Sequence, residues 1–69
     1  MINVPKGLAP HEVDLYISAF KFCEKLIREQ NIDIGAAVAK TTEKYSFIIS
    51  DKELFAQFLF REITAYTEP

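Results

Sequence analysis

Proline is absent between Pro10 and Pro69, and Gly35 is the only glycine in that stretch. Both residue types interrupt helices, so a long stretch that almost lacks them can form helices of ordinary length. Its apolar residues recur mostly with helical spacing rather than with the alternation of strands. The sequence therefore predicts an all-α fold, a small three-helix domain, in which residues 1–9 form an extended arm and residues 10–69 form a single helical domain.

Residues with strong capping preferences set the ends of the predicted helices. Pro10 suits the first position of a helix, and Asn31 tolerates the left-handed conformation that often ends one. Asp33 is a favourable N-cap for the next helix. We expect three helices, near 10–30, 34–45 and 51–66.

The start of the third predicted helix has the clearest local pattern. Ser50 and Glu53 match the capping box, in which Ser is the N-cap and Glu is the third helical residue. Before it, residues 46–50 form an aromatic and β-branched run. We expect this run to be a loop that tucks Phe47 and Ile48 into the core, and a short strand is the alternative.

The first predicted helix has more apolar surface than one side of a bundle needs. One stripe contains Val13, Tyr16, Ile17, Phe20, Cys23 and Ile27. An adjacent stripe contains Leu15, Ala19, Phe22 and Leu26. Together they span about 220° at about 100° per residue, whereas a surface helix usually buries a stripe of about 100° or somewhat more. The second stripe therefore predicts contact with a second copy or a partner protein. The alternative is that the other two helices cover both stripes.

The small size of the chain also favours a partner. A domain of this length buries only about 60% of the surface that its unfolded chain exposes. A disulfide or a zinc ion often compensates, but one cysteine and one histidine cannot supply either within one chain. Glu62 projects among apolar residues of the third helix. It can pair with Lys or Arg across an interface, or its stem can lie along the core while the carboxylate reaches water.

No residue pattern indicates catalysis, a cofactor, a metal site or a small-molecule substrate. His11 and Cys23 would lie about 18 Å apart along one helix, so they cannot act together within a chain. We expect Cys23 to be a buried, unreactive thiol. No glycine-rich phosphate loop is present, because Gly7 and Gly35 are the only glycines. The sequence therefore does not predict an enzyme.

Nucleic-acid binding is the main alternative function. Lys21, Lys25 and Arg28 form one basic patch with helical spacing. Binding to phosphates needs clustered cations, whereas the net charge is −2 and the third helix opens with Asp51 and Glu53. The spacing of small residues around the second inter-helix turn also fits no helix-turn-helix register. Nucleic acid is therefore a possible but disfavoured partner.

These observations predict a non-enzymatic protein–protein interaction module, a small homodimeric accessory or regulatory protein with the first helix at the interface. A DNA-binding transcriptional regulator of helix-turn-helix type and a structural subunit of a larger assembly are the alternatives. No apolar run approaches 18 residues, so we expect no membrane association. The lone cysteine and the absence of a leader predict a cytoplasmic location.

Overall fold

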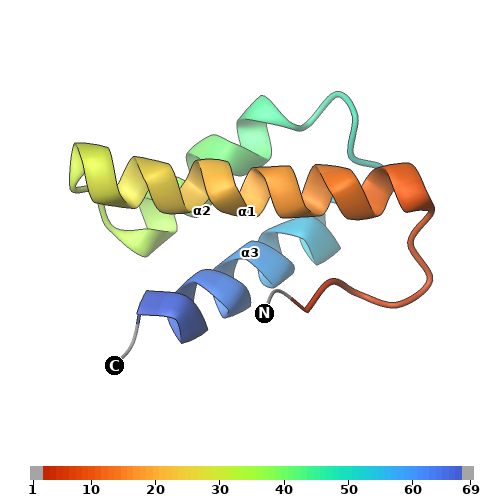
Figure 1. The fold of residues 1–69 in the computed structure, drawn as a ribbon. Helices are drawn as coiled ribbons and strands as arrows, with labels where there is room; N and C mark the ends of the chain where they lie inside the picture. The colour runs from red at the N-terminus through yellow and green to blue at the C-terminus, as the bar shows by residue number, and fades with distance from the viewer. Residues whose placement is uncertain (1–2, 68–69) are drawn as a thin grey trace.

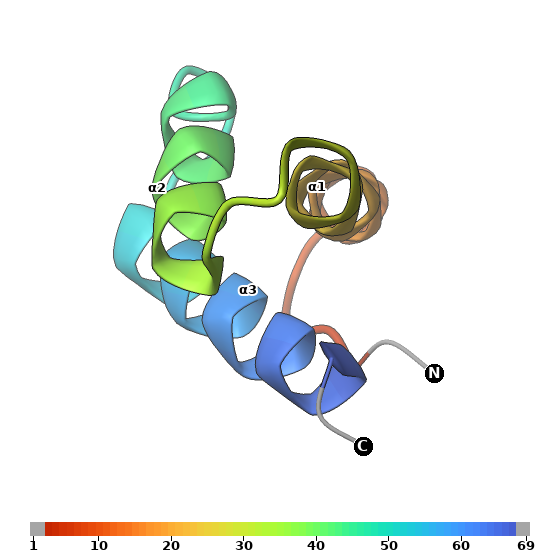
Figure 2. The ribbon, with the colours of Figure 1, turned by 90° about the vertical axis from the view of Figure 1, so that its left-hand side faces the viewer.

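The fold is a bundle of three helices, in a computed structural model that describes residues 3–67. The helices are α1 (Pro10–Gln30), α2 (Ile34–Lys44) and α3 (Lys52–Thr67) (Figure 1). Each helix packs against the other two. In Figure 2, where α1 is seen end-on, α2 and α3 lie on neighbouring sides of it. No strand occurs among the described residues. The predicted all-α three-helix domain is confirmed.

The ends of α1 lie where the sequence predicts them. The helix begins at Pro10, and the Glu12 carboxylate accepts a hydrogen bond of 3.4 Å from the backbone N–H of Ala9. Asn31 ends the helix in the left-handed conformation, with φ of 55°. Its backbone N–H donates to the carbonyl of Ile27 at 3.0 Å. Both local signals, an N-terminal proline and a C-terminal asparagine, therefore act as predicted.

The predicted N-cap of α2 is also confirmed. The Asp33 carboxylate accepts a hydrogen bond of 2.7 Å from the backbone N–H of Ala36. The helix ends at Lys44, one residue earlier than predicted, and Tyr45 is its C-cap. The Tyr45 ring lies against the Phe55 ring with 5.8 Å between centroids, so the end of α2 is held onto α3.

The predicted N-cap of α3 is wrong by one residue. Asp51, not Ser50, accepts a hydrogen bond from the backbone N–H of Leu54, at 3.0 Å. The Ser50 hydroxyl instead donates to the Glu12 carboxylate at 3.2 Å. Ser and Asp are both favourable N-caps, so their adjacent positions left two possible starts for the helix. The result is that Glu12 joins the start of α1 to the residue before the cap of α3.

The core lies where the three helices meet. The Tyr16 ring contacts the rings of Phe55 and Phe58, with centroids 5.1 Å away in each case, a favourable separation for aromatic pairs. The buried apolar residues are Tyr16, Ala19, Phe20, Cys23, Ala37, Val38, Ile49, Phe55, Phe58, Leu59 and Ile63. The four of these residues that belong to α3, Phe55, Phe58, Leu59 and Ile63, have the spacing of one helical face.

The loop between α2 and α3 differs from the prediction. Phe47 is 95% exposed and Ile48 is 54% exposed, whereas Ile49 is 5% exposed. The backbone N–H groups of Ile48 and Ile49 both donate to the Tyr45 carbonyl at 3.1 Å, which closes a tight turn. In this turn only Ile49 of the three apolar side chains reaches the core. The expectation that Phe47 and Ile48 enter the core is therefore wrong.

The arm before α1 is not helical, and it packs on the bundle. Val4 and Leu8 contact the core, and Gly7 has a φ of +88°, which glycine adopts without strain. The backbone N–H of Asn3 donates to the Glu62 carboxylate at 3.1 Å. Residues 1–2 and 68–69, at the ends of the predicted arm and helical domain, lie outside the described residues.

Candidate interaction surface

The second apolar stripe of α1 is used largely within the chain. Ala19, which the sequence predicts at an interface, has no exposed surface in this structure. Leu15 and Leu26 are half-buried and pack against the core. Phe22 is half-buried, and its ring lies 6.4 Å from that of Tyr45. The alternative, in which neighbouring helices cover both stripes, accounts for these contacts.

Lys44 covers the outer side of Phe22. Its ammonium nitrogen lies 5.0 Å from the centroid of the Phe22 ring, within the range of a cation–π contact. The contact joins the last turn of α2 to the middle of α1. The half-buried part of the α1 stripe therefore borders on the end of α2.

Glu62 has its partners within the same chain. Its side chain is 11% exposed. One carboxylate oxygen accepts the backbone N–H of Asn3, and the other lies 3.7 Å from Nε of Arg61. Pairing across an interface is therefore not needed to satisfy this carboxylate. Its position in the structure fits the other option, a stem along the core and a carboxylate at the surface.

The basic patch of α1 is exposed, as the alternative of nucleic-acid binding requires, but one of its charges is paired. Lys21, Lys25 and Arg28 all face solvent. The Arg28 guanidinium contacts the Glu24 carboxylate twice, with Nε and an Nη each 3.2 Å from an oxygen. This pairing reduces the positive potential that the patch presents to a phosphate.

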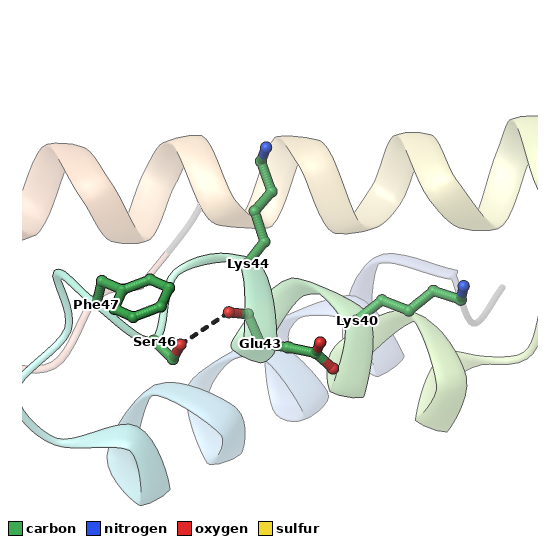
Figure 3. Close-up of a pocket in the computed structure, with 5 residues that line it drawn as sticks. All are labelled: Lys40, Glu43, Lys44, Ser46 and Phe47. Atoms are coloured by element: carbon green, nitrogen blue, oxygen red, sulfur yellow. Dashed lines mark hydrogen bonds between the residues drawn. The ribbon is translucent and has the colours of Figure 1, made fainter.

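Phe47 and Ile48 form the most exposed apolar feature in the described part of the chain, and we call this pair the loop surface. Phe47 also lines an open groove of about 480 Å³ with Lys40, Glu43, Lys44 and Ser46. We call it the basic groove. In Figure 3 Lys44 extends toward α1, and the Ser46 hydroxyl donates to the Glu43 carbonyl at 2.9 Å.

A second open groove lies at the start of α3, on the other side of the loop surface in the sequence. It has a volume of about 330 Å³ and is lined by Asp51, Glu53, Leu54 and Gln57. We call it the acidic groove, because both of its charged residues are acidic. The loop surface thus connects one groove in which lysines predominate to another in which carboxylates predominate.

Two titratable groups in the core, the Cys23 thiol and the Tyr16 phenol, have pKa values raised by burial. Cys23 is buried, as predicted, and burial raises the pKa of its thiol, although a hydrogen bond with Thr41 lowers it in part. Burial also raises the pKa of the Tyr16 phenol, with smaller contributions from the carboxylates of Glu12 and Asp51. Both shifts favour the neutral, unreactive form at neutral pH. His11 is exposed at the start of α1.

Neither a metal-binding cluster nor a membrane-spanning helix is found among the described residues. No group of three His, Cys, Asp or Glu side chains is arranged to hold a metal ion. None of the helices combines the length and the apolarity that crossing a bilayer requires.

Sequence reasoning missed the loop surface, although one signal was present. Three bulky apolar residues occupy positions 47–49 between two helices that are only seven residues apart. A turn this short cannot direct all three side chains to one side. The hydrogen bonds to Tyr45 decide which of them faces the core.

Comparison with protein-family models, curated proteins and solved structures finds no significant match to this chain.

Proposed function

We propose that this chain is a non-enzymatic protein-interaction module, a small accessory or regulatory protein whose contact is centred on the loop surface. The observation that carries this proposal is the exposure of Phe47, at 95%, beside the half-exposed Ile48. A large apolar side chain left in water forgoes roughly 1.5–3 kcal/mol of burial energy. Aromatic residues, Phe among them, are also enriched at protein interfaces relative to the rest of the surface.

The proposed contact is centred on the loop, and α1 contributes only to its edge. Lys44 lines the basic groove and also lies over the Phe22 ring, so Phe22 is linked to that groove through Lys44. The half-buried Leu15 and Leu26 retain some exposed area beside it. This arrangement supports a contact centred on the loop between α2 and α3, rather than the one centred on α1 that the sequence predicts.

The charges near the loop surface support a protein partner over nucleic acid. The exposed residues that open α3 include Asp51 and Glu53, which would repel phosphates at the end of a recognition helix. The Arg28 charge on α1 is paired with Glu24. For the same reasons we propose no contact with anionic membrane surfaces. A cytoplasmic location fits the single, buried thiol of Cys23.

Photocrosslinking in cells tests the proposal. Phe47 of the full chain is replaced by p-benzoylphenylalanine, and Glu29, an exposed residue in the last turn of α1, is replaced in a control. This turn lies far from the loop between α2 and α3 (Figure 1). We expect a discrete protein adduct from position 47 and none from position 29. Absence of any adduct specific to position 47 would refute an interaction through the loop surface.

A further inference from the structure

We propose that the partner of the loop surface is a second copy of this chain, bound across a twofold axis with Phe47 of each copy in the acidic groove of the other. This inference rests on the proposed function and names the partner. In a twofold contact the same patch is used by both copies, so that patch must be complementary to itself. The charged residues around Phe47 and Ile48 meet this condition.

The first argument is the balance of charges beside the loop surface. Three cations and three anions flank it, and all six side chains are exposed: Lys40, Lys44, Lys52, Glu43, Asp51 and Glu53. Their sum is zero, so the patch as a whole attracts neither a polyanion nor a polycation. A balanced patch instead fits a surface of equally mixed charge. None of the six forms an ion pair within the described part of the chain.

The second argument is the distribution of these charges. The basic groove has two lysines and one glutamate, and the charged residues that line the acidic groove are Asp51 and Glu53. In the proposed dimer the twofold axis passes between the two grooves, so the basic groove of one copy faces the acidic groove of the other. The reverse pairing follows from symmetry, so each favourable contact is made twice. The same symmetry doubles the effect of any charge reversal.

The third argument is the position of Phe47 relative to the lysines. Phe47 lines the same groove as Lys40 and Lys44, as Figure 3 shows. When its ring enters the acidic groove of a second copy, those lysines arrive beside the carboxylates that line it. Leu54 supplies an apolar contact for the ring inside that groove. The apolar contact of Phe47 and the ionic contacts of Lys40 and Lys44 can therefore form in the same arrangement of the two copies.

The overall charge of the chain does not oppose this association. The net charge is −2, so the long-range repulsion between two copies is small. The apolar part of the patch consists of only two side chains, Phe47 and Ile48, whereas a stable dimer buries about 800 Å² on each copy. We therefore expect a weak, reversible dimer that forms between micromolar and millimolar concentration.

Sedimentation equilibrium of the purified chain tests the inference. The parent is expected to shift from monomer to dimer as concentration rises, and Phe47→Ala to weaken the association by about tenfold or more. Because the Phe47 side chain makes almost no contact in its own chain, circular dichroism should show an unchanged fold. A parent that stays monomeric at millimolar concentration, or a dimer that Phe47→Ala leaves intact, overturns the inference.

Charge exchange gives a sharper test. Lys40→Glu and Glu53→Lys should each weaken the homodimer, because each brings like charges together twice. The double variant should restore it, and a mixture of the two single variants should form heterodimers. Glu29→Lys changes the net charge as Glu53→Lys does, but away from the patch, and should leave the dimer unchanged. A double variant as weak as either single variant contradicts the twofold pairing.

The two proposals can fail separately. A monomeric parent whose position-47 crosslink joins a different protein removes the second copy as partner and leaves the interaction function standing. The absence of a position-47 crosslink in cells removes the function itself. A crosslink between two copies of the chain supports both.

Discussion

Phe47 and Ile49 lie close together in the loop between α2 and α3, but truncation to alanine should destabilise the fold at position 49 and hardly at position 47. Ile49 is buried in the core, so Ile49→Ala should cost about 2–5 kcal/mol through lost burial and the cavity left behind. Phe47 faces solvent, so Phe47→Ala should change the stability of the monomer by less than about 0.5 kcal/mol. A domain of this length has a total stability of roughly 3–10 kcal/mol, so the loss at Ile49 is a large fraction of it.

Thermal unfolding at low micromolar concentration, where the monomer predominates, measures both effects. A loss of 1 kcal/mol lowers the Tm of a domain this small by about 4–8 °C. We therefore expect Ile49→Ala to lower the Tm by at least about 8 °C, and Phe47→Ala by less than about 4 °C. A matched loss of Tm in the two variants would show that Phe47 is also packed in the core. The loop surface, and both proposals that depend on it, would then be wrong.

Three further predictions follow from the cap of α3 and from the buried titratable groups. Asp51→Ala should cost about 1 kcal/mol in urea unfolding because it removes the cap, and Ser50→Ala should cost less because its hydroxyl bonds only an exposed carboxylate. Equal losses would contradict the assignment of the cap. The pKa of Tyr16 is raised in the folded chain, so the unfolded chain loses this proton first and stability should fall as pH rises above about 10. Tyr16→Phe should flatten this alkaline decline, measured by urea titration at several pH values, and an unchanged slope would count against it. The Cys23 thiol should resist a thiol reagent until the chain unfolds, because it is buried and its pKa is raised; rapid labelling of the folded chain would contradict this.

The fold could be predicted largely from local signals. Pro10, Asn31 and Asp33 act on their own few neighbours, and each of these ends is where the sequence places it. The start of α3 was misplaced by one residue because Ser50 and Asp51 are both good caps. In the structure Asp51 caps the helix, and the Ser50 hydroxyl donates instead to the carboxylate of Glu12, 38 residues away. Such a contact is not visible in local sequence.

The candidate surface could be predicted only in part. Helical periodicity measures how wide the apolar face of α1 is, but it does not say which neighbour covers it. In the structure the C-terminal end of α2 lies against this stripe at Phe22, which contacts Lys44 and the capping residue Tyr45. The exposure of Phe47 depends on the direction of a turn, which backbone hydrogen bonds to Tyr45 set. The first outcome depends on tertiary packing and the second on the geometry of a short turn, so residue types and spacing alone do not decide them.

Because α2 is short, the conformation of the loop surface depends on how α2 packs against the rest of the bundle. An isolated helix of 11 residues is marginal in water, so α2 depends on its packing against α1 and α3. Local opening of α2 would release Lys40 and Lys44 and loosen the turn that presents Phe47. A partner that holds the loop surface therefore also holds α2 in place. Amide hydrogen exchange in α2 should slow when the surface is occupied, while exchange in the middle of α1 should change less.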